Sequence, residues 1–348
     1  MSKFKVNSIT DKSGYCGPVI AGVSTNNSTG CMIIPAGPTE NRGGRGRGVF
    51  ASGFSGAAPS PGNLVDTMDF VEIATTGNAL DFGDQSRSGY QQASVSSSIR
   101  GVIMGGANPS GSLASMGYVT ISSQGGANDY GDLRQATTHG GAASNNTRGI
   151  IGGGYNSPVY FSTIDYVTIA TTGDSMTFGS LSATRWFAGN TRASTTRLLF
   201  IGGATPTNLN IIEFVEIPTL GNSQDFGELS GTLKGYGMGA GNCQSSTRTV
   251  TMGAWDGSSD RNDIHYLTFA TKGDSIDFGD LLATTRGGGS NSNKTRGILA
   301  GGRTPTQVNT IQYITIASTG NAQDFGDLTS IRAFNCAGMS DAHGGLER

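Results

Sequence analysis

Apolar and polar positions follow a pattern that repeats along most of the chain. Residues 147–196 show it best: an arginine-led apolar run ends in glycines at 148–154, and a run of β-branched and aromatic residues follows at 164–169. Apolar side chains occupy both faces of the second run, as in a strand that is packed on both sides. A third segment surrounds Phe178, and a fourth, rich in small residues, precedes the next arginine-led run. The pattern predicts four strands per repeat.

Two landmarks set the period of the repeat. An aromatic residue followed by glycine, and an arginine that opens the first apolar run, each recur about every 50 residues. The aromatic landmarks are Phe82, Tyr130, Phe178, Phe226, Phe278 and Phe325. The arginine landmarks are Arg47, Arg100, Arg148, Arg197, Arg248 and Arg296. Such a strand-rich period is typical of a radial or solenoidal β array, so we expect one body of six units and not several unrelated domains.

The small-residue segment of each unit is expected to lie innermost. Its copies include residues 139–144, 235–240, 287–290 and 336–339, which are rich in glycine and alanine. Six copies of one strand crowd around the axis of a propeller, where large side chains would overpack the centre at a cost of about 1–3 kcal/mol each. The segment that carries the aromatic landmark is therefore expected outermost.

The two ends of the repeat array complete each other. The first unit begins at Arg47 without a small-residue segment, whereas an additional one, at 331–340, follows the last unit. Pairing this segment with the run at Arg47 would close the ring and remove its open strand edges. The sequence therefore predicts an all-β, six-bladed β-propeller over residues 41–348, closed by the C-terminal strand.

Residues 1–40 lie outside the repeat. Short apolar stretches there are broken by Gly, Asn, Ser and Pro, which predicts an extended arm with two or three short strands. We expect the arm to attach the propeller to a partner protein that covers its strand edges, and a flexible tail is the alternative. The candidate contacts of the arm are Phe4, Val6, Ile9, Val19 and Ile20.

The composition of the chain limits the kinds of partner that can be expected. The 348 residues carry a net charge of −2, which gives no electrostatic reason to expect nucleic acid or an anionic membrane as a partner. No apolar run approaches the ~20 residues of a spanning helix, and the N-terminus lacks the apolar core of a signal peptide. The four cysteines form no CxxC pair, and Cys16 with Cys31 is the one locally plausible disulfide, which the sequence leaves open.

Enzymatic chemistry finds little support in the residues. A copper site would need converging imidazoles, but His139, His265 and His343 show no pair at ligand spacing. The Asp-Phe-Gly triplets resemble the kinase metal-binding motif, yet they recur in several units without the other kinase elements. The aspartate boxes of sialidases are absent. We therefore expect no catalytic residue, no metal and no cofactor, with a carbohydrate-active or oxidative enzyme as the least favoured alternative.

Charged residues recur in phase with the units. The arginine landmarks would form one ring, and a second set lies near the start of the innermost strand. The second set is Arg87, Arg185, Lys234, Arg286 and Arg332, and a matching acidic set is Asp84, Asp132, Glu228, Asp280 and Asp327. A ligand site is rarely repeated in every unit, so these side chains are expected to form ion pairs and hydrogen bonds to loop carbonyls within and between blades.

The connections between the second and third strands vary most among the units. They cover residues 54–67, 108–115, 155–163, 205–210, 255–263 and 304–310. In four-stranded blades these connections emerge on one face, and variable loops on a rigid scaffold are typical of a recognition surface. Ordinary loop variation is the alternative. The candidate partner-binding residues are Tyr155, Tyr160, Phe161, Trp255, Asp256, Asp260 and Arg261.

The units resemble the kelch repeat of galactose-oxidase-like propellers. The paired glycines 105–106, 153–154, 202–203 and 301–302 take the position of the kelch double glycine. Tyr166, Phe214, Tyr266 and Tyr313 take that of the kelch tyrosine. Phenylalanine stands where kelch repeats have tryptophan, as at Phe178. The resemblance covers residues 41–342 and implies blade architecture, while it says little about function.

The arm at 6–22 and repeats of the form TIATTGNALDFGD are similar to propeller-bearing structural proteins of tailed bacteriophages. The resemblance implies a non-enzymatic virion protein of a tail, fibre or head appendage that assembles in the host cytoplasm. It also implies several copies per particle, attachment to other virion proteins through the arm, and recognition of a host surface glycan or receptor. A cellular protein-interaction propeller of the kelch type is the main alternative.

Overall fold

The computed structural model describes residues 46–56, 63–186, 191–230, 238–334 and 337–346, and only the backbone of residues 24–25, 32–33, 238–240 and 304. The chain divides into two compact units, Met1–Arg42 and Gly43–Arg348. In the first unit, β1 (Ser24–Thr25) pairs antiparallel with β2 (Met32–Ile33). The arm contacts predicted at Phe4, Val6, Ile9, Val19 and Ile20 lie outside the described residues, as do Cys16 and Cys31.

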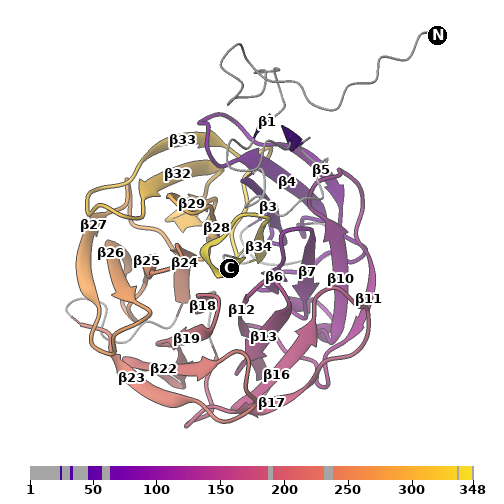
Figure 1. Ribbon diagram of the computed structural model, residues 1–348, viewed down its shortest axis with the longest axis vertical. Helices are drawn as coiled ribbons and strands as arrows, with labels where there is room; N and C mark the ends of the chain where they lie inside the picture. Colours follow the sequence, from indigo (N-terminus) through magenta and orange to yellow (C-terminus); the bar gives the residue numbers. More distant parts are fainter. Residues whose placement is uncertain are drawn as a thin grey trace. The chain divides into compact units, whose positions relative to one another are not determined.

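The second unit is a six-bladed β-propeller, as the sequence predicted. Six antiparallel four-stranded sheets are arranged around one axis (Figure 1). The innermost strands, in blades 1 to 6, are β34 (Ala337–Ser340), β6 (Ala93–Ser96), β12 (Gly141–Ser144), β18 (Thr191–Ala193), β24 (Met238–Gln244) and β28 (Gly289–Ser292). The second strands are β3 (Arg47–Ala51), β7 (Arg100–Met104), β13 (Arg148–Gly152), β19 (Arg197–Ile201), β25 (Arg248–Trp255) and β29 (Arg296–Ala300).

Two further strands complete each blade. The third strands are β4 (Thr67–Glu72), β10 (Ser115–Thr120), β16 (Thr163–Thr168), β22 (Ile211–Glu216), β26 (Asp260–Thr268) and β32 (Thr310–Thr315). The outermost strands, which carry the aromatic landmarks, are β5 (Leu80–Asp84), β11 (Asn128–Asp132), β17 (Met176–Ser180), β23 (Gln224–Glu228), β27 (Ile276–Asp280) and β33 (Gln323–Asp327). The predicted order from small-residue strand to aromatic strand is confirmed.

The C-terminal strand closes the ring. β34 pairs antiparallel with β3, with Gly48 opposite Ser340 and Val49 opposite Met339. Blade 1 is therefore built from both ends of the propeller unit, and the sheet order β34-β3-β4-β5 confirms the predicted closure. Closure leaves no blade with an open side toward a missing neighbour.

The core lies between blades. One cluster joins Ile150 and Phe178 of blade 3 to Leu198, Phe200 and others of blade 4. Apolar side chains on both faces of a strand can be buried only if another sheet packs on each face. The stacked blades provide this, which explains the two-sided apolar runs in the sequence.

Side-chain sizes are matched across the blade interfaces. A Cβ atom on Gly149 of blade 3 would lie 2.5 Å from Cγ2 of Val95 in blade 2. At the next interface the larger residue is on the other side, because Leu198 of blade 4 packs in one cluster with Ala143 of blade 3. Glycine follows four of the six landmark arginines, at Gly48, Gly101, Gly149 and Gly297, and there it makes room for the innermost strand of the preceding blade.

Backbone hydrogen bonds join the outermost strands to their neighbours. The amides of Gly77 and Ala79 in blade 1 donate to the carbonyls of Phe325 and Asp327 in blade 6, at 2.8 and 2.7 Å, and the same pair of bonds recurs at every interface. A Cβ atom on Gly326 would lie 2.5 Å from the carbonyl oxygen of Gly77. The glycine of the Asp-Phe-Gly triplet is therefore required by this outer clasp between blades.

The landmark arginines form a second clasp. Each guanidinium lies 4.1 to 4.6 Å above the aromatic ring of its own third strand. Each also donates to a carbonyl of the next blade, from Arg47 to Ile121 around to Arg296 to Ile73. The predicted hydrogen bonds to loop carbonyls are confirmed, and Arg47 and Arg197 also pair with Glu72 and Glu216.

The second charged set is less regular than the sequence suggested. Arg185 pairs with Glu213, and Arg332 with Asp69 at 2.8 Å, where all four side chains are almost fully buried. Arg87 is exposed. Lys234 lies outside the described residues.

The variable connections contain short ladders where the sequence predicted loops. The added two-residue strands are β8 (Ala107–Asn108) with β9 (Gly111–Ser112), β14 (Tyr155–Asn156) with β15 (Val159–Tyr160), β20 (Ala204–Thr205) with β21 (Thr207–Asn208), and β30 (Arg303–Thr304) with β31 (Thr306–Gln307). In blade 5, β25 and β26 themselves extend to Trp255 and Asp260. The helical structure in the described part of the chain is the short η2 (Gly344–Leu346), and no helix there could cross a membrane.

Candidate functional site

The variable hairpins share one face with the connections between blades. We call this the hairpin face, and we call the opposite one, which carries the tight turns such as 97–100, the turn face. On the hairpin face, bridges join four of the connections to the base of a hairpin: Tyr90 with Ala107, Thr138 with Tyr155, Trp186 with Ala204, and Arg286 with Arg303. These bridges hold the hairpins at their base, so the face has fixed geometry.

A series of backbone hydrogen bonds links four of the connections between blades at the hairpin face. The amide of Gln91 donates to the carbonyl of Phe334, that of His139 to Gln91, and that of Phe334 to Gly287. Gln91, His139 and Phe334 all have φ between 54° and 57°, an uncommon conformation for residues with side chains. Such strain persists where the surroundings impose it, and here it turns each amide toward the preceding blade.

Aromatic side chains gather along this series of hydrogen bonds. Phe54 stacks on Phe334 at 5.4 Å between ring centroids and meets Tyr90 edge-on at 5.7 Å. His139 meets Trp186 edge-on at 4.7 Å, and burial lowers the pKa of His139, so its ring is neutral. Tyr90 and Trp186 were not among the predicted site residues, because they lie in connections that vary little in length.

Hydroxyl groups cover the free edges of the innermost strands. The Ser96 hydroxyl donates to the carbonyl of Ser340 in the preceding blade and accepts from its amide. Ser144 makes the same two contacts with Ser96. Unpaired strand groups would otherwise need water in the channel. Small residues in this strand thus serve two purposes, because they fit the narrow centre and they satisfy its edges.

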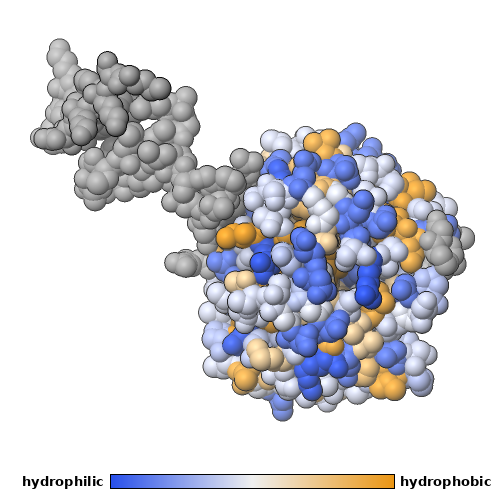
Figure 2. Space-filling view, turned by 90° about the vertical axis from the view of Figure 1, so that its right-hand side faces the viewer, coloured by the Kyte–Doolittle hydropathy of each residue, from blue (hydrophilic) through white to orange (hydrophobic). Residues whose placement is uncertain are grey.

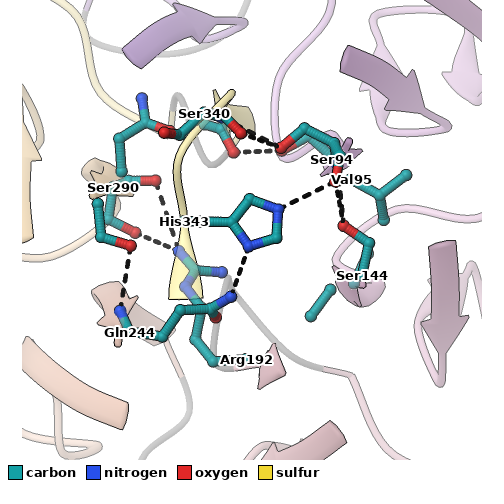
Figure 3. Close-up of a pocket in the computed structure, with 14 residues that line it drawn as sticks. Ser94, Val95, Ser144, Arg192, Gln244, Ser290, Ser340 and His343 are labelled. Atoms are coloured by element: carbon teal, nitrogen blue, oxygen red, sulfur yellow. Dashed lines mark hydrogen bonds between the residues drawn. The ribbon is translucent and has the colours of Figure 1, made fainter. Parts of the chain in front are cut away.

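Two longer side chains occupy the axial channel (Figure 3). The Arg192 guanidinium donates to the hydroxyl of Ser290 at 2.5 Å. It also donates to the carbonyl of Asn242 at 2.6 Å. His343 enters from the C-terminal segment; its Nε2 donates to the carbonyl of Ser96, and its Nδ1 accepts from the Gln244 amide, each at 2.9 Å. The remaining cavity has a volume of about 30 Å³, which is room for one or two water molecules.

The protonation state of His343 follows from this setting. Burial lowers its pKa to about 4, although the hydrogen bond to the Ser96 carbonyl opposes the shift, and nearby Arg192 adds to it. Cys243 in the innermost strand of blade 5 is also buried, which raises the pKa of its thiol to about 12. The channel is thus lined by neutral groups and one guanidinium held by oxygen acceptors.

The predicted residues of blade 3 lie on one small hairpin. Tyr155 and Tyr160 are directly opposed in the β14–β15 ladder, with ring centroids 4.9 Å apart. Phe161 follows the ladder, and its amide donates to the carbonyl of Gly154. Val159 at the tip is 52% exposed. The hairpin therefore presents a partly exposed aromatic pair beside an apolar tip.

The predicted residues of blade 5 form a charged hairpin end. Asp256 accepts from the amides of Ser258 and Ser259, both at 2.8 Å, and pairs with Arg261 at 2.5 Å. Partial burial opposes ionisation of Asp256, but these hydrogen bonds outweigh it and hold the pKa of Asp256 well below its usual range. Trp255 lies directly opposite Asp260.

The two predicted groups do not form one pocket. They belong to blades 3 and 5, with blade 4 between them, and no hydrogen bond or ring contact joins them among the described residues. Within those residues, no three His, Cys, Asp or Glu side chains are placed to hold a metal ion.

The three histidines have separate surroundings. His139 lies at the hairpin face and His343 in the channel, while Nδ1 of His265 lies 3.3 Å from the Ser275 hydroxyl between third and outermost strands. Burial lowers the pKa of His265, and nearby Asp277 and Asp263 oppose the shift.

Comparison with known proteins does not identify a relative of this chain. No protein-family model matches the chain, and no curated protein matches it. The site is therefore interpreted from its own geometry and from the resemblances in the sequence.

Proposed function

We infer that this protein is a non-enzymatic recognition protein, in which the propeller presents the hairpin face to a surface molecule outside the particle or cell that carries it. One observation carries the proposal: the six blades match one another in their clasps and differ on the hairpin face. The differing hairpins hold Tyr155, Tyr160 and Trp255 on rigid ladders. Fixed, partly exposed aromatic side chains are the groups from which binding surfaces are built at low entropic cost.

The axial channel offers no comparable site. Arg192, His343 and the serines of the innermost strands fill it, and about 30 Å³ remains. A sugar or a peptide side chain needs several times that volume. A ligand must therefore bind at the surface, and this supports a binding role over an enzyme that works at the channel.

The biological setting of the proposal comes from the resemblance to propeller-bearing structural proteins of tailed bacteriophages. In that setting the chain belongs to a tail, fibre or head appendage and reaches the virion in the host cytoplasm. Its arm, with Phe4, Val6, Ile9, Val19 and Ile20, contacts other virion proteins, and several copies share one particle. The hairpin face then recognises a glycan or receptor on the host surface.

Particle purification followed by an adsorption assay tests this proposal. The chain should copurify with intact particles through a density gradient, and the purified full chain should compete with particles for adsorption to host cells. Tyr160→Ala should weaken the competition at least tenfold, whereas Leu220→Ala, at an exposed turn-face position, should leave it unchanged. A chain that is absent from particles and binds a cellular protein would support the kelch-type interaction propeller instead.

A further inference from the structure

The bridge at the base of the blade 6 hairpin differs in charge from the bridges described in blades 2, 3 and 4. The bridge at the base of the hairpin pairs Tyr90 with Ala107 in blade 2 and Trp186 with Ala204 in blade 4. At the equivalent bridge of blade 6, Arg286 pairs with Arg303. The bridges described in blades 2, 3 and 4 hold no charged residue, so the two arginines of blade 6 call for a local explanation.

The geometry makes this arginine pair unfavourable by itself. The amide of Arg303 donates to the carbonyl of Arg286 at 2.9 Å, and the reverse bond is 3.2 Å. Residues opposed in this way project their side chains to the same side of the ladder, where like charges destabilise the pairing. An anion held between the two guanidinium groups would remove the repulsion.

The positive charge of Arg286 is partly compensated by a carboxylate, and that of Arg303 is not. Nε of Arg286 lies 3.3 Å from Oδ1 of Asp260, and its guanidinium lies 5.6 Å from the centroid of the Trp255 ring. Nε of Arg303 donates to the carbonyl of Pro305 at 2.7 Å. No carboxylate of a described residue forms an ion pair with Arg303. One positive charge at this place is therefore unmatched.

The neighbouring hairpin end of blade 5 adds an aromatic ring on which a ligand can stack. Trp255 is partly exposed and lies beside the Arg286 guanidinium. Arg261 directly follows Asp260, the ladder partner of Trp255, and its charge is matched by Asp256. The cluster thus contains three guanidinium groups, two carboxylates and one indole, in a chain whose net charge is −2.

We propose that Trp255, Asp260, Arg261, Arg286 and Arg303 form a binding site for an acidic sugar residue, one that bears a carboxylate or a sulfate group. The indole stacks on the C–H face of the sugar ring, and Arg303 with Arg286 binds the anionic group through charge-assisted hydrogen bonds. Asp260 accepts from a sugar hydroxyl. The inference rests on the proposed function and specifies the class of glycan recognised by the hairpin face.

The charge of the cluster favours an acidic glycan over a nucleic acid. Binding to a phosphate backbone relies on several cations in a row, each neutralising one phosphate. Here a single unmatched charge stands beside an aromatic platform and two carboxylates. This combination suits one anionic group on an otherwise neutral, hydroxyl-rich ring.

Binding of the full chain to matched polysaccharides tests the site. Four immobilised probes separate the two sources of the anion: oligogalacturonate against its methyl ester, and dextran sulfate against dextran. We expect binding to at least one acidic probe, and at least tenfold weaker binding to its neutral counterpart. Arg303→Gln should reduce affinity for the acidic probe at least tenfold, because it removes the unmatched charge. Arg87→Gln, which removes an exposed positive charge elsewhere, is the matched control and should bind like the unaltered chain.

Several results would overturn the inference. Equal affinity for acidic and neutral probes would show that the site does not recognise an anionic group. Equal losses from Arg303→Gln and Arg87→Gln, or equal competition by single-stranded DNA, would show unspecific attraction between charges. Absence of binding to every probe would also refute it. Binding to a neutral probe that Tyr160→Ala abolishes would refute this site while the proposed function stands. Thermal unfolding of each variant within a few degrees of the unaltered chain ensures that a loss of binding is local.

Discussion

At the scale of single residues, the propeller depends on side-chain sizes that are matched between neighbouring blades. The innermost strand of one blade and the second strand of the next exchange large and small residues. Val95 faces Gly149 at one interface, while Ala143 and Leu198 share a cluster at the next. In each pair one residue is large and the other small, and the strand that supplies the large one differs between interfaces. The blades therefore share a backbone arrangement but differ in their side chains.

Converting one pairing into the other tests this matching. Gly149→Leu alone should destabilise the protein by about 1–3 kcal/mol, because the new side chain meets Val95. Val95→Ala, which alone should cost about 1 kcal/mol, should restore stability when combined with Gly149→Leu. Denaturant unfolding of the single and double variants measures the coupling. If the two losses simply add, the residues are not matched across the interface.

His343 should make stability depend on pH. Its pKa is about 4 in the folded protein and 6.5 in the unfolded chain, so the unfolded chain binds more protons between these values. Stability from this residue is therefore full above pH 6.5 and is lost as pH falls toward 4, by up to about 3 kcal/mol. Thermal unfolding of the unaltered chain and of His343→Gln at pH 7 and pH 4 should show a smaller pH effect in the variant. An equal effect in both would contradict the assignment.

The roles predicted for single residues were confirmed where the same residue has the same role in every blade. The ring of arginines was expected to bind loop carbonyls, and all six do. The roles of the glycines in the Arg-Gly and Asp-Phe-Gly pairs were not expected. They depend on the approach of a neighbouring blade, and a single sequence does not show which atoms approach.

At the scale of elements, each blade is held on the outside by its outermost strand and on the inside by the covered edges of its innermost strand. The outer clasp adds two backbone hydrogen bonds per interface. Each such bond contributes about 0.5–1.5 kcal/mol net, so the clasps together stabilise the ring strongly.

A glycine substitution isolates the outer clasp. Gly326→Ala places a Cβ atom 2.5 Å from the carbonyl oxygen of Gly77, at a φ of 147°. Gly111→Ala has a similar φ, 128°, but nothing lies within 4 Å of its Cβ atom. Both variants carry backbone strain of about 1–3 kcal/mol. Gly326→Ala should lose clearly more stability in denaturant unfolding, and equal losses would show that the close approach contributes nothing.

Removal of the closing strand should disrupt the whole ring. A chain that ends at Arg332 lacks β34, which leaves β3 unpaired on one side. Exposed edges promote association between chains, so this variant should aggregate or lose cooperative unfolding. A chain that ends at Leu346 keeps the strand and should behave like the full chain. Size-exclusion chromatography with thermal unfolding makes the comparison, and a monomeric, cooperative truncated chain would contradict the role of closure.

The sequence predicted the strands and their order, but it gave only part of the candidate site. The strands and the closure of the ring could be predicted because the same pattern occurs in six copies, so a deviation in one copy does not hide it. The short ladders at 155–160 and 303–307 were expected as loops, because two-residue strands are too short for periodicity to identify. Arg286 and Arg303 were not linked, since their bridge joins two segments that only the fold brings together.

At the scale of the whole molecule, the propeller unit offers surfaces of different character. Along the rim, exposed residues at one position of the outermost strands alternate between apolar and amide side chains from blade to blade. They are Leu80, Asn128, Met176, Gln224, Ile276 and Gln323. The side of the rim seen in Figure 2 mixes hydrophilic and hydrophobic residues. The rim therefore presents separate apolar positions, and the hairpin face has the more distinctive chemistry.

The central claim is tested most directly by a cryo-electron microscopy map of the virion in which we propose that this protein is assembled. The account predicts that residues 1–40 contact another virion protein and that the hairpins at 155–161 and 255–261 point away from the particle. A map in which these hairpins are buried against the particle would contradict it.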